Sequence, residues 1–317
     1  MAIGLVGNLK SPKIPGQINL NETPNMNFQN VAHYHFRIGE IEATALSDGQ
    51  TLFPAYPSYA INANEEEVQA TLKNHFFSTN LYRLQCTILH LKVSEKSILI
   101  DTGAGNTLGN DLGNLDANLR RAGIDPDEIT DILLTHCHLD HIGGLMINNE
   151  AAFTNAIIHL SDKEWSFWSS KSIDLSGMPL DQSFRDNFIR AARNNLNPLA
   201  DRIKTFRFNE EVISGIQAIN AVGHSPGHTN YLIKSGEESL LHTGDIFHHN
   251  GFDLDHPKWA TAFDQDIKKA YQTRKMVLDM ASVDRIFLAS YHMPFPSIGH
   301  VFKKGNSYGW VPSQWIL

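Results

Sequence analysis

The chain has 317 residues, of which 42% are hydrophobic and 19% are charged, and its formal net charge is −8. This composition supplies enough apolar side chains for a sizeable core and excludes a disordered chain. The acidic balance argues against a broad nucleic-acid interface, which needs a surplus of Lys and Arg on one face. We therefore expect a soluble protein that binds no nucleic acid.

The beginning of the chain carries no feature of a membrane or export segment. The sequence has no run of about 18 apolar residues, and residues 1–16 lack the basic segment and cleavage site of an export signal. We expect a cytoplasmic protein without membrane contact; the alternative is a periplasmic or secreted protein whose signal was removed before the numbering begins. Residues 1–33, rich in Asn, Pro and Gly, are expected to form an arm before a single domain over residues 34–317.

The first half of the domain predicts strands that alternate with helices. Residues 35–49 predict two short strands around a Gly turn, and residues 62–76 have helical spacing with acidic residues at the start. Residues 86–103 predict two apolar strands around a polar turn. Residues 110–124 then predict a helix and residues 130–136 a buried strand.

The second half repeats this theme. Helices are predicted over residues 181–203 and 266–281, and strands over residues 156–160, 215–222, 230–236, 239–247 and 285–292. Several of these strands end in short polar sequences. Two sheets with helices on their outer faces would bury the apolar runs, so we predict an α/β fold, a four-layer αββα sandwich.

The segment THCHLDHIGG, residues 135–144, is the strongest chemical signal among the 16 histidines. His136 and His138, two residues apart on an extended chain, face the same way and can share one metal ion. Asp140 and His141 follow on the turn and can reach a second ion. Imidazole and carboxylate ligands suit zinc, and also manganese, iron or cobalt. The sequence therefore predicts two divalent metal ions per chain, with zinc the preferred metal.

Other candidate ligands follow later strands. His224 lies in AVGHSPGH, Asp245 in HTGDIF and His292 in SYHMP. Gly143 and Gly144 are expected to let the backbone turn sharply after the first motif. Two cysteines, Cys86 and Cys137, permit one disulfide at most, and Cys137 is expected to point away from the metal.

The order HxHxDH, GHSPGH, TGD and a late histidine resembles the metallo-β-lactamase superfamily from about residue 34 onward. The resemblance implies two metal positions and a shared ligand: His136, His138 and His224 for one ion, Asp140, His141 and His292 for the other, and Asp245 between them. It also implies that His228 supports its loop without binding metal.

Finer features resemble methyl parathion hydrolase-like enzymes: FRIGEIEATALSDG, SILIDTGAG, HTGDIF and the closing YHMPFPSIGHVFKKGNSYGWVP. This branch implies a homodimeric, dinuclear hydrolase that uses a metal-bridging hydroxide to cleave small esters, lactones or phosphotriesters. The alternatives are an N-acyl-homoserine lactonase (quorum quenching), an iron-containing redox protein on the same fold, and a metal-binding protein without catalysis. Substrate preference and metal identity discriminate among them.

Further side chains are assigned roles around the metals. Asp140 is expected to move a proton as well as bind metal. His248 stands where lactone-cleaving relatives often carry a Tyr, so we expect it to bond the substrate oxygen; the alternative is a solvated loop histidine. Asp101 is expected to orient a ligand histidine, or else to bond its own turn. The substrate pocket is expected to include four aromatic or imidazole side chains: Trp168, Phe184, Phe247 and His248.

Overall fold

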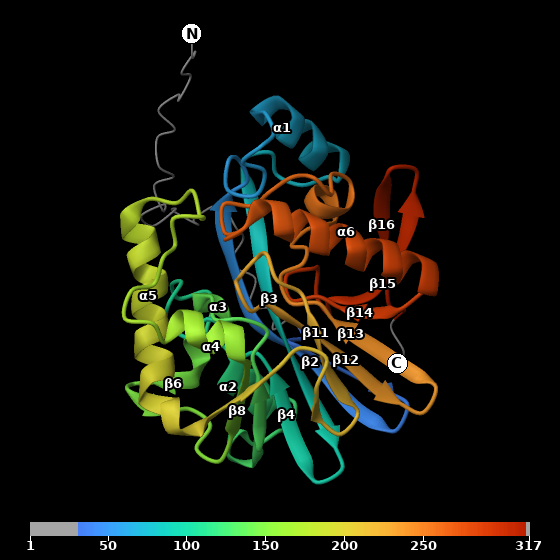
Figure 1. Ribbon diagram of the computed structural model, residues 1–317. Coiled ribbons are helices and arrows are strands. Elements are labelled where there is room, and N and C mark those ends of the chain that lie inside the picture. The colour runs from blue at the N-terminus through green and yellow to red at the C-terminus, as the bar shows by residue number, and fades with distance from the viewer. Residues whose placement is uncertain (1–30, 315–317) are drawn as a thin grey trace.

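Two seven-stranded sheets form the centre of the computed structural model, which describes residues 31–314 (Figure 1). The first sheet has the order β1-β2-β3-β4-β5-β8-β9. Its strands are β1 (His33–Ile38), β2 (Ile41–Pro54), β3 (Leu81–Val93), β4 (Lys96–Ile100), β5 (Asp131–Leu133), β8 (Ile157–Ser161) and β9 (Ile203–Phe206). β1 begins at His33, one residue before the predicted start of the domain at residue 34. Of the predicted arm, residues 1–30 lie outside the described residues.

The second sheet runs in sequence order from β10 to β16. Its strands are β10 (Glu211–Ile213), β11 (Ile216–Asn220), β12 (Thr229–Ser235), β13 (Glu238–His242), β14 (Phe287–Ala289), β15 (Ile298–Lys304) and β16 (Ser307–Pro312). A separate two-stranded sheet pairs β6 (Met146–Ile147) with β7 (Glu150–Ala151).

Parallel pairing inside each sheet brings distant parts of the chain to one edge. β4 pairs in parallel with β5, and β13 pairs in parallel with β14. The carboxyl ends of parallel strands meet at the same edge of a sheet, where ligands bind in open α/β folds. The candidate ligands predicted from the sequence all follow such strand ends or lie in the loop between β11 and β12.

Helices cover the outer faces of the two sheets: α2 (Leu115–Arg121), α3 (Leu139–Ile142), α4 (Asp162–Trp168), α5 (Gln182–Leu196) and α6 (Ile267–Asp284). α1 (Glu65–Asn74) instead lies at one end of the molecule, where it packs on residues 55–60 and 252–259. One buried apolar cluster joins the first sheet to α2, α3 and α5, a second lies between the sheets, and a third joins the second sheet to α6. The predicted αββα order of layers is therefore present, as Figure 1 shows.

Helix starts follow the capping signals in the sequence. Asn64 and Glu67 form a reciprocal capping box at α1, and the Asp181 and Asp266 side chains accept N–H groups in the first turns of α5 and α6. The prediction of these three helices is confirmed. α4 and the strands β9, β10, β15 and β16 were not predicted, because their segments lack the apolar run that marks the equally short β5 and β14.

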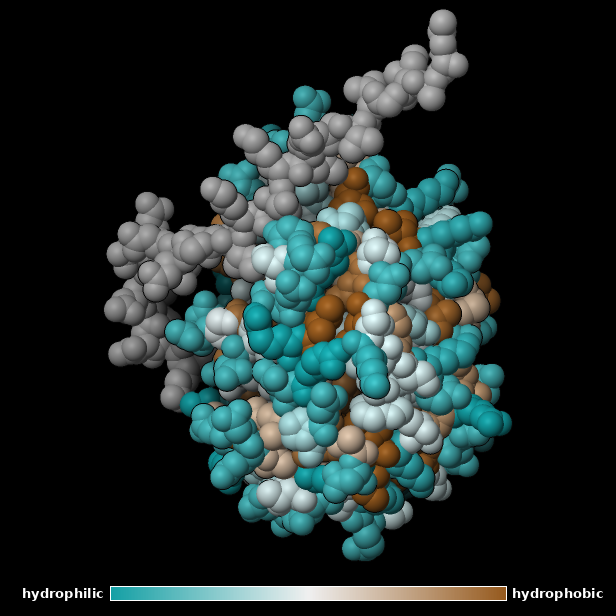
Figure 2. All heavy atoms as spheres, turned by 60° about the vertical axis from the view of Figure 1, so that its left-hand side comes forward, coloured by the Kyte–Doolittle hydropathy of each residue, from teal (hydrophilic) through white to brown (hydrophobic). Residues whose placement is uncertain are grey.

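The surface toward α5 is mostly polar, with apolar side chains gathered in a narrow band (Figure 2). Within residues 31–314, no helix combines the length and the apolar character that crossing a membrane requires.

Candidate metal centre

The predicted ligands meet where the edges of the two sheets come together. His136 and His138 follow β5, Asp140 and His141 lie in α3, and His224 lies between β11 and β12. Asp245 follows β13 and His292 follows β14. All seven side chains are buried. The structure therefore brings together every candidate ligand that the motifs predicted.

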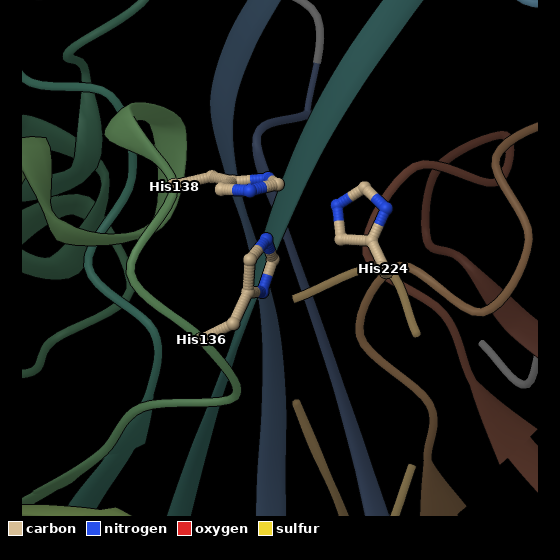
Figure 3. Close-up of side chains that lie close together, drawn as sticks. All are labelled: His136, His138 and His224. Carbon is tan, nitrogen blue, oxygen red and sulfur yellow. The ribbon is translucent and has the colours of Figure 1, made fainter. Parts of the chain in front are cut away.

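Three histidines form a compact group at this edge. Ligand atoms of His136, His138 and His224 lie within 4.8 Å of one another. Figure 3 shows the three imidazole rings turned toward a common point, two from the loop after β5 and one from the loop after β11. This spacing is suitable for three ligands of one ion.

Asp245 connects this group to the remaining candidate ligands. Its Oδ2 atom lies 3.3 Å from His224 Nε2 and 3.1 Å from His292 Nε2. Its Oδ1 atom lies 3.2 Å from His141 Nε2. The Asp140 Oδ2 atom is in turn 3.5 Å from His292 Nε2 and 3.7 Å from His141 Nε2. The Asp245 carboxylate thus faces both the three-histidine group, through His224, and a second group of imidazoles, His141 and His292.

The buried atoms at the centre fit divalent cations. Within residues 31–314, five of them have no hydrogen-bond partner: Nε2 of His136, His138, His141 and His224, and Oδ1 of Asp245. Leaving such groups unpaired away from water is costly, so their convergence requires a common partner. Burial and the neighbouring His141 hold the pKa of His136 well below its usual range, and burial does the same for His138. Neutral imidazoles are the form that binds metal.

The other ring nitrogens of these histidines are held by fixed acceptors. The Nδ1 atoms of His141 and His224 lie 2.8 and 2.9 Å from carboxylate oxygens of Asp101 and Asp264. His292 Nδ1 lies 2.6 Å from the Gln85 carbonyl oxygen. Such partners orient metal-binding imidazoles and leave Nε2 facing the ion. Asp101 thus stands beside a ligand histidine, as the sequence suggested. Asp264 and Gln85 carry no local signal that could have found them.

His228 lies behind the centre. Its Nε2 atom accepts the N–H of Asp245 at 3.1 Å, so it fixes the loop that carries this carboxylate. Gly244 next to it adopts φ +49°, and a Cβ there would lie 2.7 Å from His228 Nε2. A residue other than glycine at this position would push the histidine away from Asp245.

The two glycines after the first motif serve a purpose other than a sharp turn. Gly143 has φ −62°, which any residue adopts. A Cβ at Gly143 or Gly144 would instead clash with the carbonyl oxygens of Ala104 and Thr102. The prediction of a glycine-dependent turn is therefore wrong, and the glycines are required because two backbone segments approach closely.

An aromatic pocket opens onto the centre. Its apolar walls are Phe53, Tyr59, Leu84, Leu108, Leu139, Phe184, Phe188 and Phe263, and its polar floor is His138, Asp140, His224, Asp245, His248 and His292. Phe184 and His248 were predicted as lining residues. Phe184 reaches the pocket from the first turn of α5, beside Phe188 at 5.6 Å between ring centroids.

Two predicted pocket residues lie elsewhere. The Trp168 side chain is buried in the core, where its indole N–H donates to Glu164 at 2.8 Å. Phe247 packs in the cluster between the second sheet and α6, 6.5 Å from the Trp310 ring. Neither residue is among those that line the pocket, although the Trp168 ring lies 6.1 Å from the ring of His138.

Tyr59 is a pocket residue that the sequence did not reveal. Its ring is held by Tyr82 at 4.5 Å, Phe263 at 5.6 Å and His248 at 5.8 Å between centroids. The Tyr59 hydroxyl forms no hydrogen bond within residues 31–314, and burial, Tyr82, Asp140 and Asp245 all raise its pKa. Because Tyr59 lines the pocket beside the centre, its hydroxyl is available to a bound molecule.

His248 lies between Asp245 and this tyrosine. Its Nε2 atom is 3.4 Å from Asp245 Oδ2, and its ring stacks on His292 at 5.2 Å. The backbone N–H of His248 donates to Asp253 at 2.7 Å, and its Nδ1 atom has no hydrogen-bond partner in the part of the chain that the structure describes. The alternative of a solvated loop histidine is wrong, because the side chain is buried.

Both cysteines are free and buried. Cys86 Sγ lies 4.0 Å from Asp140 Oδ2 at the edge of the centre, whereas Cys137 packs in the core under α4 and α5. The disulfide that the count allowed is therefore absent from the described residues.

Comparison with known proteins places this centre in a family. A model of the metallo-beta-lactamase superfamily matches residues 81–287. AidC, a dizinc quorum-quenching lactonase solved with a product homoserine, aligns with a TM-score of 0.85 and 30% identity over 90% of this chain and 99% of its own. The hydrolase AbOPH, in the beta-lactamase superfamily, aligns with a TM-score of 0.83 and 29% identity over 91% of this chain and 100% of its own.

Relatives by sequence are N-acyl homoserine lactonases. One from Bacillus cereus is 27% identical over 124 residues, which are 39% of this chain and 40% of the relative. One from Bacillus thuringiensis is 26% identical over 175 residues, 49% of this chain and 61% of the relative. The matches thus span about half the length of these relatives. The methyl parathion hydrolase-like branch is not confirmed, and the lactonase alternative agrees better with these relatives.

The homodimer and the cytoplasmic location remain predictions. The fold and the superfamily predicted from the motifs are confirmed by the family match and by the near-complete superposition on AidC. The chain belongs to the metallo-beta-lactamase superfamily.

Proposed function

We propose that this protein is a metal-dependent hydrolase that opens the ring of N-acyl homoserine lactones. The observation that carries the proposal is the position of the Asp245 carboxylate, which faces imidazoles of both groups beneath an aromatic pocket. The similarity to a dizinc lactonase over 99% of that chain supports the same activity. The whole reaction is assigned to the single domain over residues 34–317.

We assign the ligands to two positions, as the motifs implied. The first position comprises His136, His138 and His224, the second comprises Asp140, His141 and His292, and Asp245 is shared; zinc is the proposed metal. Two divalent cations, when bound, polarise a carbonyl oxygen and lower the pKa of water to roughly 7. The donor set of imidazoles and carboxylates fits that role.

The pocket walls suit the acyl part of the substrate. Phe184, Phe188 and Phe263 offer apolar surface next to the polar floor. An acyl chain packed against these rings would hold the lactone carbonyl toward Asp245 and His248. The formal net charge of −8 is compatible with this neutral substrate.

Asp140 is the residue to which we assign proton transfer. Ring opening adds one water across the ester bond, so a proton has to reach the departing alkoxide oxygen while a carboxylate forms. The Asp140 side chain lines the pocket and keeps 11% of its surface exposed. Its backbone carbonyl accepts the Tyr291 hydroxyl at 2.7 Å, which fixes the residue in place.

Replacement of His248 by Ala is expected to reduce kcat/KM for the lactone by about 10- to 100-fold, the effect of losing a hydrogen bond to a charged oxygen. The matched control is His249→Ala, since His249 is also a buried histidine but does not line this pocket. Initial rates on an N-acyl homoserine lactone measure both. Unchanged kcat/KM in His248→Ala would remove His248 from the mechanism.

Replacement of Tyr59 by Phe is expected to lower kcat about tenfold with little change in KM, because the hydroxyl would bond the substrate oxygen more strongly as charge develops on it. Tyr56→Phe removes a hydroxyl from the same loop, outside the pocket lining, and serves as the control. Equal kcat values for the two variants would show that the Tyr59 hydroxyl does not act on the substrate.

The overall proposal is tested with three substrates: an N-acyl homoserine lactone, an aryl ester and a phosphotriester. We expect about two zinc ions per chain and the highest kcat/KM on the lactone. A preference for the phosphotriester would restore the methyl parathion hydrolase-like reading. A coloured, iron-containing protein that cleaves none of the three would favour the redox alternative.

A further inference from the structure

A buried carboxylate outside the ligand set joins the two loops that carry the three-histidine group. Glu164 lies in α4 and is 0% exposed. It is not a candidate ligand, and no sequence motif pointed to it. Its two oxygens nevertheless accept four hydrogen bonds from groups on three different segments.

Each oxygen of Glu164 serves a different loop. Oε1 accepts the backbone N–H of Cys137 at 2.9 Å and the indole N–H of Trp168 at 2.8 Å. Oε2 accepts the Ser225 hydroxyl at 2.8 Å and the Gly227 N–H at 2.6 Å. Cys137 stands between His136 and His138, and Ser225 directly follows His224. The carboxylate therefore fixes the distance between the loops that carry these three imidazoles.

The local structure around Glu164 is built for this contact. Ser161 caps α4 by accepting the Glu164 N–H at 3.2 Å, and its hydroxyl donates to the Gly227 carbonyl at 2.8 Å. A Cβ at Gly227 would clash with the Glu164 backbone nitrogen, so only glycine permits the loop to approach. The start of α4 and the loop between β11 and β12 are thus packed together along their backbones.

Only a carboxylate satisfies the four donors. An ionised carboxylate has acceptor sites on both oxygens, whereas the amide of Gln would direct its NH₂ group at one pair of N–H or O–H donors. With the NH₂ group on the Oε1 side, the N–H groups of Cys137 and Trp168 would both face a donor. On the Oε2 side the Ser225 hydroxyl can turn to accept, but the Gly227 N–H would still face a donor. At least one buried N–H loses its acceptor, so the two loops would separate to relieve the conflict. Glu164→Gln is therefore an isosteric test of the contact.

The histidines of the second metal position have separate hydrogen-bond partners. Its imidazoles are held by Asp101, which bonds His141, and by the Gln85 carbonyl, which bonds His292. Asp101 also accepts the Thr135 N–H at 2.8 Å. None of the four bonds to Glu164 comes from these residues.

We propose that Glu164 is a positioning residue that sets the geometry of the three-histidine metal position and leaves the other position unaffected. The inference rests on the ligand assignment of the proposed function. It predicts that the two ions respond differently to one substitution at a residue that contacts neither of them.

The experiment is a metal titration of the full chain carrying Glu164→Gln, by competition with a chromophoric zinc chelator. We expect one ion to bind about 10- to 100-fold more weakly, the effect typical of losing a partner that orients ligands, and the other to bind as in the unsubstituted protein. Combination with His292→Ala should leave no tightly bound ion. Combination with His224→Ala should add little to the effect of His224→Ala alone.

Asp131→Asn is the matched control for loss of a buried carboxylate. Asp131 accepts hydrogen bonds from His159 at 2.8 Å and Lys96 at 2.6 Å, at the start of β5, and contacts no candidate ligand. It should lower the melting temperature of the metal-free protein and leave both zinc affinities unchanged. If Glu164→Gln only destabilised the fold, it would likewise lower the melting temperature and leave both zinc affinities unchanged.

Equal weakening of both ions, or of neither, in folded Glu164→Gln would overturn the inference. If Glu164→Gln does not fold, Ser225→Ala is used in its place, because it removes one of the four donors. It should weaken zinc binding at the three-histidine position by a few-fold, and unchanged zinc affinity in Ser225→Ala would also overturn the inference. Failure of the proposed function is distinct, because it would show as fewer than two ions in the unsubstituted protein.

Discussion

Replacement of Asp245 by Asn is expected to reduce kcat/KM for the lactone by about 1,000-fold or more. The cations supply several kcal/mol of charge stabilisation, and each 1.36 kcal/mol, approximately, is worth a factor of ten in rate. Asp245 is the carboxylate that lies within 3.3 Å of His141, His224 and His292. An amide in its place keeps the shape but removes the negative charge shared by the two positions.

The measurement pairs initial rates with the metal content of each variant. The control is Asp279→Asn, which removes an exposed carboxylate that pairs with Lys275 and Lys303 far from the pocket. That variant should keep its activity and both ions. A folded Asp245→Asn protein that retains two ions and turns over the lactone within about tenfold of normal would show that Asp245 is not the shared ligand.

The first motif could be predicted because all its information is local. His136, His138, Asp140 and His141 occupy six consecutive positions after a buried strand, so spacing alone brings them together. His224, Asp245 and His292 could be placed near them because each follows the end of a strand, and strand ends meet at one edge of a sheet. The αββα order followed from the same alternation of strands and helices.

The supporting residues could not be predicted because they reach the centre from distant segments. Asp264 bonds His224 across 40 positions, and Glu164 contacts Gly227 across 63 positions, with no local pattern in either case. Tyr59 lies in an irregular loop after β2, where no periodicity indicates which side chains turn inward. Packing of separate elements decides these contacts, and one sequence does not specify that packing.

The sequence also did not show which aromatic side chains line the pocket. Trp168 and Phe184 both lie on helices near the ligand loops, yet only Phe184 lines the pocket. Helical spacing tells which residues share a face and does not tell which layer that face meets. The position of α4 is fixed by the Glu164 bonds to Cys137, Ser225 and Gly227, contacts that only the folded structure contains.

Complete removal of metal is expected to abolish turnover and to lower the melting temperature by about 16 to 32 °C. Each ion bound to the native state adds about 4 kcal/mol when free metal exceeds its Kd 1,000-fold, so two ions add about 8 kcal/mol, and a domain of this size shifts by about 2 to 4 °C for each kcal/mol. Metal removal lowers the melting temperature because buried ring nitrogens then lose their only partners, the bound ions. These are the Nε2 atoms of His136, His138, His141 and His224.

Calorimetric scans of the chelated and zinc-reloaded protein measure this shift, with lactone turnover followed in the same samples. Reloading with zinc should restore both the melting temperature and the rate, because the ring nitrogens opposite the ions stay fixed by Asp101, Asp264 and Gln85 in the folded chain. The Asp279→Asn variant should show the same shift as the unsubstituted protein. An identical melting temperature with and without metal would mean that the centre is stable without ions, and the ligand assignment would then be wrong.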